Sequence, residues 1–159
     1  MSPRRSAVRD ALRVGVTHEG LRAPVAARRM ADTSRYVLRA EGVRAAMVSV
    51  TLVSVSAMAR LNRRHLRHEG ATDVISFGFA PAPGVGVIGD IYVCPDVARR
   101  NARSAACGVR EELLRLIVHG TLHVLGWDHP EDGARESSPM WRRQERLLAD
   151  VLRRQACRA

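Results

Sequence analysis

Residues 109–129 read VREELLRLIVHGTLHVLGWDH and hold three of the six histidines of the chain. Apolar side chains cover most of the circumference of a helix drawn from Val109 to Leu125, which predicts a central and largely buried helix. These side chains are Leu113, Leu114, Leu116, Ile117, Val118, Leu122 and Val124. Glycine adopts the left-handed backbone conformation without steric cost, so Gly126 is expected to end the helix and let the chain turn back.

The histidines of this stretch have the spacing of a metal site. His119 and His123 are four residues apart, which stacks them on one helix face with Cβ atoms about 5–6 Å apart. His129 follows the turn and is expected to arrive as a third ligand from outside the helix. Three imidazoles leave one place open in a tetrahedral zinc shell, which is typical of catalytic rather than structural sites. Nickel, copper and iron also accept imidazole, so zinc is a preference.

The same spacing is similar to the metzincin protease pattern H-E-x-x-H-x-x-G-x-x-H. The glutamate of that pattern is the general base of the proteases, and Gly120 holds its position here. Glycine has no side chain that can take a proton. A different hydrolytic reaction is therefore expected, with a metalloprotease kept as the less favoured alternative.

Composition places the chain among globular proteins that bind polyanions. Its 159 residues suit one domain over 1–159, with flexible ends expected at 1–10 and 155–159. The net charge is +10 and all 26 basic residues are arginines, which favours nucleic acid as a partner. The alternative for part of this excess is solvated surface of an arginine-biased chain. The odd number of cysteines and the charged N-terminal sequence favour a reducing cytoplasm over export.

Hydrophobic patterns predict an alternating order of strands and helices. Strands are expected at 12–17, 43–53, 73–79 and 88–94, with the last two paired as a hairpin across a loop at 80–86. Helices are expected at 24–40, 54–68, 96–106, 109–125 and about 140–154, with a polar connection at 130–139. The expected core positions outside the central helix are Val25, Met30, Val37, Leu38, Met58, Leu61, Leu66, Leu147, Leu148, Val151 and Leu152. This order predicts an α+β domain with a small four-stranded mixed sheet and about five helices, the central buried one carrying the metal ligands.

Four sequence blocks carry a family resemblance. Residues 119–129 agree almost position for position with the signature H-G-x-L-H-L-x-G-[YW]-D-H. Leu61-Asn62, the TDVISF block at 72–77 and the GDI block at 89–91 follow the same pattern in order and spacing. With these blocks the chain resembles the YbeY family, bacterial zinc-dependent endoribonucleases that mature ribosomal RNA. The likeness is clearest over 43–152.

The resemblance implies a site and a biological role. His119, His123 and His129 would bind one zinc ion beside a cleft, between sheet and helix, that admits single-stranded RNA. The implied role is maturation of the 3′ end of small-subunit (16S) ribosomal RNA and ribosome quality control. The partners implied by the family are pre-ribosomal RNA, the small ribosomal subunit, a ribosome-assembly GTPase and a small-subunit ribosomal protein, with no membrane involved.

One position departs from the family pattern. Many members carry an active-site arginine four residues after the asparagine that Asn62 matches, and here that position is Leu66. Arg63 lies one helical turn back and Arg67 lies about 100° away on a helix, so each is a weak candidate for the missing charge. Asp128 is a candidate for orienting a ligand imidazole through its second nitrogen, or else a turn residue.

The predicted reaction is hydrolysis of phosphodiester bonds in RNA. Zinc would lower the pKa of a bound water towards about 7 or polarise a phosphoryl oxygen, and an arginine would stabilise the developing charge. Surface arginines would bind the RNA backbone, so binding should weaken as salt is added. A non-catalytic alternative is a ribosome assembly factor in which zinc stabilises the fold and the basic surface binds pre-ribosomes.

Overall fold

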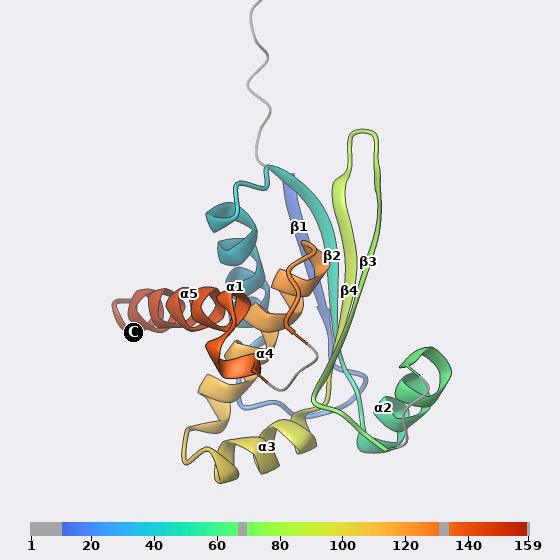
Figure 1. Cartoon of the computed structure of the whole chain (residues 1–159), viewed down its shortest axis with the longest axis vertical. Helices are drawn as coiled ribbons and strands as arrows, with labels where there is room; N and C mark the ends of the chain where they lie inside the picture. Colours follow the sequence, from blue (N-terminus) through green and yellow to red (C-terminus); the bar gives the residue numbers. More distant parts are fainter. Residues whose placement is uncertain (1–10, 67–69, 131–133, 159) are drawn as a thin grey trace, which may run out of the picture.

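A computed structural model describes residues 11–66, 70–130 and 134–158 of the chain. Its main elements are β1 (Ala11–Thr17), α1 (Ala27–Ala40), β2 (Ala45–Leu52), α2 (Val55–Leu61), β3 (Val74–Ala82), β4 (Gly86–Val93), α3 (Pro95–Ser104), α4 (Val109–Val124) and α5 (Pro139–Ala156) (Figure 1). A π-helical segment, η1 (Asn62–Leu66), follows α2, and a short 3-10 helix, η2 (Arg135–Ser137), precedes α5. The segment 1–10, expected to be flexible, lies outside the described residues. None of the described helices is long and apolar enough to cross a membrane.

The strands form one mixed sheet in the order β1-β2-β4-β3. β2 is parallel to both β1 and β4, whereas β3 and β4 form the predicted antiparallel hairpin. Parallel neighbours need a crossover connection, which α1 supplies between β1 and β2. Figure 1 shows α1, α4 and α5 on one side of the sheet and α2 beyond one end of it. The predicted α+β class, with a four-stranded mixed sheet and five α-helices in the described ranges, is confirmed.

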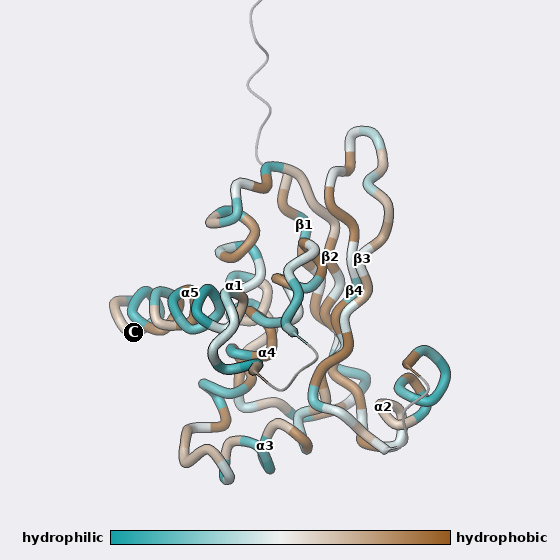
Figure 2. Tube along the Cα trace, viewed as in Figure 1, coloured by the Kyte–Doolittle hydropathy of each residue, from teal (hydrophilic) through white to brown (hydrophobic). Residues whose placement is uncertain are grey.

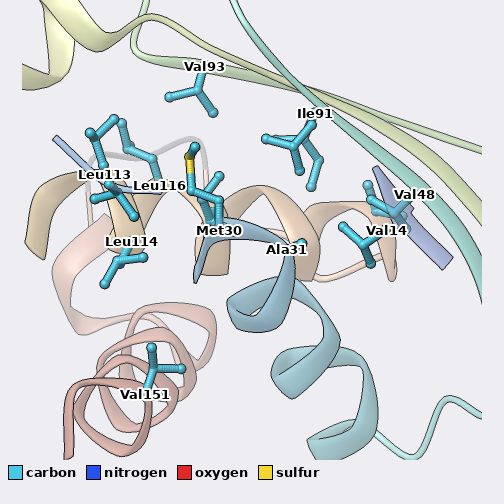
Figure 3. Packing of buried hydrophobic residues seen from close by; sticks show 14 of the residues in the cluster. Val14, Met30, Ala31, Val48, Ile91, Val93, Leu113, Leu114, Leu116 and Val151 are labelled. Atoms are coloured by element: carbon cyan, nitrogen blue, oxygen red, sulfur yellow. The ribbon is translucent and has the colours of Figure 1, made fainter. Parts of the chain in front are cut away.

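The helix α4 lies at the centre of the core, as its apolar pattern predicts. The seven apolar residues expected to cover it are all buried, and the helix contacts α1, α3, α5, β3 and β4. Figure 3 shows Met30 of α1, Leu113 of α4 and Ile91 of β4 in the layer between helices and sheet, where each is fully buried. The expected core positions in α1 and α5 are buried too, except Leu152, which is half-buried.

The hairpin is longer than predicted. Prolines and glycines at 80–86 predicted a loop, but β3 continues to Ala82 and β4 begins at Gly86. Proline is tolerated in β3 because this strand lies at the sheet edge, where one side of its backbone faces no partner strand. The pairing register shifts between Phe79 and Ala82, which accommodates the irregularity. The predicted loop was therefore wrong at both ends.

The second predicted helix changes its form before the predicted end. Its α-helical part stops at Leu61, and η1 continues to Leu66. Met58 is fully buried, but Leu66 is 45% exposed. A π-helical segment holds more residues per turn, so the residues that follow rotate away from the apolar face of the preceding helix. The prediction of Leu66 as a core residue was wrong.

Candidate metal centre

The end of α4 positions the histidines. His119 and His123 lie one turn apart on the same face of the helix. The helix then ends in a Schellman arrangement, in which the N–H of Gly126 donates to the carbonyl of His123 at 2.9 Å and the next N–H donates to Leu122 at 3.0 Å. Gly126 has a φ of 90°, which a side chain would disfavour. The chain therefore reverses and brings His129 back over the helix end.

The three imidazoles converge. Their candidate ligand nitrogens all lie within 4.8 Å of one another. The ring centroids are 4.5 Å apart for His119 and His123, 5.2 Å for His123 and His129, and 5.9 Å for His119 and His129. His119 is buried and the other two rings are half-buried. The structure thus brings together all three histidines that the sequence singled out, in an arrangement that could hold a metal ion.

Hydrogen bonds fix the orientation of two of the rings. Nδ1 of His123 lies 2.9 Å from the carbonyl oxygen of Trp127, and a carbonyl only accepts, so Nδ1 carries the proton. Nδ1 of His119 lies 2.7 Å from Oε1 of Gln144, whose amide nitrogen donates to Glu145 at 2.9 Å. Both rings therefore keep the lone pair on Nε2, the tautomer in which an imidazole can bind a metal.

Burial keeps these imidazoles neutral. Desolvation, together with charge repulsion from the nearby His123, lowers the pKa of His119 to about 4. Desolvation also lowers the pKa of His123, with His129 and Arg135 adding to the effect. A neutral imidazole is the form that binds a metal, so the surroundings favour ligation near neutral pH.

Close packing explains the glycine between the two helical histidines. A Cβ atom on Gly120 would lie 2.7 Å from Cγ2 of Ile91 and 2.9 Å from Oγ of Ser76. No residue with a side chain fits there unless α4 moves away from the sheet. The protease glutamate is thus excluded by packing as well as by the sequence.

The histidines line a cavity of about 450 Å³ between β3, η1 and the segment after α4. Leu66 lies on its wall, at the position where the family resemblance implies an arginine. Arg63 is exposed on η1 and is not part of the wall, and Arg67 lies outside the described residues. Arg63 therefore does not line the cavity in this structure, and a catalytic role for Arg63 or Arg67 stays a prediction.

Arg135 supplies a positive charge at the cavity instead. Its Nη2 lies 3.3 Å from Nε2 of His119, and it is the one arginine among the described residues of the wall. It comes from η2, inside the stretch at 130–139 that was predicted as a polar connection. Sequence reasoning missed Arg135 because only the folded chain brings this segment against α4. No periodic pattern marks it.

A hydroxyl on the wall has no partner. Among the described residues, Oγ of Ser76 is the one buried side-chain oxygen or nitrogen without a hydrogen bond. Ser76 lies on β3 and lines the same cavity as the histidines. A buried polar atom without a partner costs stability, and this one lies 2.9 Å from the position of a Cβ on Gly120, so it is a candidate either for contact with a bound molecule or for support of α4.

Asp128 acts on the backbone in this structure. Its Oδ1 accepts the main-chain N–H of His129 at 2.9 Å, as a turn residue does. The Nδ1 atoms of His119 and His123 are bonded to Gln144 and Trp127 instead. The role of Asp128 as a partner of a ligand imidazole stays a prediction.

Fold and site together define an α+β domain with a three-histidine group that could hold a metal at the end of its central helix. The family model described as Endoribonuclease YbeY matches residues 20–152, and the chain belongs to this family. The resemblance inferred from residues 119–129 is thereby confirmed.

Known relatives agree with this assignment. An Endoribonuclease YbeY of Micrococcus luteus is 41% identical over 118 residues, covering 70% of this chain and 74% of the relative. Another, from Beutenbergia cavernae, is 41% identical over 131 residues, covering 77% and 86%. The solution structure of a Thermotoga maritima protein is similar in fold, with a TM-score of 0.61 and 24% identity over 91% of this chain and 93% of that one.

Proposed function

We propose that this protein is a metal-dependent endoribonuclease that hydrolyses phosphodiester bonds in single-stranded RNA, with one zinc ion held by His119, His123 and His129. The observation that carries the proposal is the convergence of three imidazoles at a polar cavity in a chain of the YbeY family. The donor set fits zinc, because imidazole nitrogen is one of its preferred ligands and three such ligands leave a place for substrate or solvent. When bound, zinc would supply Lewis-acid chemistry at a phosphoryl oxygen or a solvent molecule.

The chain's own residues prepare this site. Gln144 and the carbonyl of Trp127 hold the rings of His119 and His123 in one tautomer and one orientation. Preorganised groups of this kind need no rearrangement when the substrate arrives, which is where much of the catalytic advantage of an enzyme site comes from.

Arg135 is the residue that we assign to the phosphate. Its guanidinium lies at the cavity and donates towards Nε2 of His119. When that nitrogen binds a metal, its lone pair is no longer available, and the exposed arginine side chain is free to donate to substrate instead. A guanidinium forms paired hydrogen bonds to phosphate oxygens, so Arg135 would bind the scissile phosphate and stabilise its developing negative charge.

The biological role follows the family. We propose that the substrate is the 3′ region of small-subunit ribosomal RNA, that the protein acts in the cytoplasm in maturation and quality control, and that a ribosome-assembly GTPase and a small-subunit ribosomal protein are partners. The net charge of +10 supports an RNA substrate, since a basic surface attracts the phosphate backbone.

The reaction class is tested with zinc-loaded protein, a single-stranded RNA and an unstructured protein as substrates. We expect the RNA to be cut internally, the protein to stay intact, and a chelator to stop the reaction. Cleavage of the protein substrate alone would establish the metalloprotease alternative, which the packing around Gly120 opposes.

Two further measurements test the metal and the need for catalysis. The purified wild-type chain should hold one equivalent of zinc, and the His129→Ala variant almost none. Another metal in the wild-type chain would overturn the zinc assignment. If His123→Ala loses the metal yet restores ribosomal RNA processing in a deletion strain, the protein is an assembly factor and catalysis is not its task.

A further inference from the structure

A basic groove lies between α1 and α5, away from the histidines. Its volume is about 430 Å³, and it shares no lining residue with the histidine cavity. Five of the ten residues that line it are arginines, and one is a carboxylate. These residues are Arg28, Arg29, Arg39, Arg154, Arg158 and Asp32. We call this surface the α1–α5 groove.

The packing of α1 against α5 builds this groove. The guanidinium of Arg154 lies 4.7 Å from the centre of the Tyr36 ring, a cation–π contact across the two helices. The hydroxyl of Tyr36 donates to Asp150 at 3.1 Å, which ties the ring to α5. Figure 2 shows hydrophilic residues recurring along both helices. An aromatic ring and a guanidinium therefore form a fixed floor between flexible charged side chains.

Most of the positive charge in the groove is uncompensated. The carboxylate of Asp32 already accepts Arg35 at 2.9 Å, with Arg28 at 3.9 Å. In the described part of the chain, Arg29, Arg39 and Arg158 make no side-chain hydrogen bond or ion pair, and all three are exposed. Clustered like charges repel one another, so a groove of this kind attracts an anion strongly.

The arginine bias of the whole chain does not explain the cluster. A cavity of about 770 Å³ beside the histidine cavity is lined by two arginines, Arg115 and Arg135, but by four carboxylates. In that cavity Arg115 bonds to Glu111, Glu112 and Glu145. Arg115 in that cavity is thus balanced locally, whereas five arginines of the α1–α5 groove face one acid.

We propose that the α1–α5 groove binds the phosphate backbone of RNA, at a segment other than the one held in the histidine cavity. This inference rests on the proposed function for the choice of RNA. Arginine forks match phosphate geometry, and the exposed edge of a Tyr–Arg stack suits contact with ribose or base. An acidic polypeptide would bind to the same charges, but it would gain less binding energy from the Tyr36–Arg154 pair. The groove would fasten a long RNA to the protein while a distant part of it enters the site.

The test is RNA affinity in the full chain with Arg29→Gln, Arg39→Gln and Arg158→Gln combined. These side chains make no hydrogen bond or ion pair within the described residues, so their loss should leave the fold intact. The matched control replaces Arg103, Arg110 and Arg146, which are also exposed and lie outside the groove. Both variants are made in the His123→Ala background, so that the probe, a fragment of about 100 nucleotides from the 3′ end of small-subunit ribosomal RNA, is not cut.

We expect the groove variant to bind this RNA at least tenfold more weakly at low salt, and the control at most threefold more weakly. The slope of log affinity against log salt should fall by about 2–3 in the groove variant, since each lost phosphate contact removes about 0.7–0.9. Unchanged thermal unfolding of both variants confirms that the fold is intact.

Two results would overturn the proposal. Equal losses of RNA affinity in the groove and control variants would mean that RNA binds to positive charge over the whole surface and not to the groove. Binding of polyglutamate as tight as that of RNA, lost in the same variant, would assign the groove to an acidic protein. Failure of the proposed function is separate, because it shows as absent RNA cleavage by the zinc-loaded wild-type chain, whatever the binding data show.

Discussion

The histidine cavity and the α1–α5 groove both face the same expected substrate, but they are built in opposite ways. In the cavity, buried neutral groups are fixed by hydrogen bonds, as for His119 and Gln144 at 2.7 Å. In the groove, exposed charged side chains surround a small fixed floor, and three of them hold no partner among the described residues. Chemistry needs preorganised groups in a desolvated place, whereas binding a polyanion needs only accumulated charge. Mutations should therefore act on the cavity steeply and on the groove gradually.

The largest effect is expected for Arg135, which is an exposed arginine like those of the groove but lies at the histidine cavity. Replacement of Arg135 by glutamine should lower kcat for RNA cleavage by about 10²–10³-fold, the usual loss when one donor to a developing oxyanion is removed. KM should change much less, and Arg135→Lys should restore part of the rate. The measurement is steady-state cleavage of a short RNA by the zinc-loaded variants.

Arg63 is the matched control for this prediction. It is exposed on η1 and lies off the cavity wall, so Arg63→Gln should stay within about threefold of the wild type for an exposed charge without a ligand contact. The reverse outcome, a large loss of kcat in the Arg63 variant and none in the Arg135 variant, would mean that Arg63 supplies the catalytic charge, as the sequence suggested.

Acid should destabilise the metal-free protein through the same buried imidazoles. The unfolded chain binds a proton at His119 with a pKa near 6.5, but the folded chain does so only near pH 4. Between these values the unfolded state holds the extra proton, so stability is complete above pH 6.5 and falls as the pH falls towards 4. The loss from His119 should be about 2 kcal/mol, after a discount for relaxation around the site.

Urea unfolding of the chelator-treated protein at pH 7, 5.5 and 4.5 measures this loss. His119→Gln should flatten the dependence while leaving the part due to His123, whose pKa is also lowered by burial. A dependence that is identical in the variant and the parent would show that His119 is not held neutral by the fold.

A smaller effect is expected for Gln144, which orients the imidazole of His119. Gln144 is buried, and its Oε1 accepts a hydrogen bond from the Nδ1–H of His119. Gln144→Leu keeps a buried side chain of similar size but leaves that N–H without an acceptor, so zinc affinity should fall about 10–100-fold. Competition with a chelator of known affinity measures it. Arg146→Leu, an exposed position on the same helix, should leave zinc affinity unchanged, and an equal fall there would contradict a specific role for Gln144.

These predictions also mark how far sequence alone reaches. The central helix, the three histidines and the turn at Gly126 are local patterns: a 3.6-residue apolar period, an i, i+4 pair and a helix-ending glycine. Each depends on neighbours within a few residues, so each could be predicted. The mixed sheet followed from the order of elements.

Other parts of the site depend on contacts that sequence patterns do not carry. Arg135 and Gln144 lie 16 and 25 residues from His119, and only tertiary packing brings them to it. Leu66 was misplaced because the change from α-helix to π-helix at Asn62 has no simple sequence signal. The extension of the edge strand β3 to Ala82 was not predicted because it contains a proline. The cost of a proline in a strand depends on whether a partner strand lies beside it.

The smallest effect should come from the unpartnered hydroxyl of Ser76, and it separates two roles. If Oγ contacts only the bound substrate, Ser76→Ala should raise KM for RNA by about 3–10-fold, the value of one hydrogen bond, without lowering stability. Stability should even rise slightly, because a buried oxygen without a partner in the free protein is removed. A loss of both stability and zinc affinity would instead mean that the hydroxyl supports α4 beside Gly120, 2.9 Å from where its Cβ would lie. Measuring unfolding, zinc affinity and KM on this one variant therefore decides whether the Ser76 hydroxyl contacts the substrate or stabilises the fold.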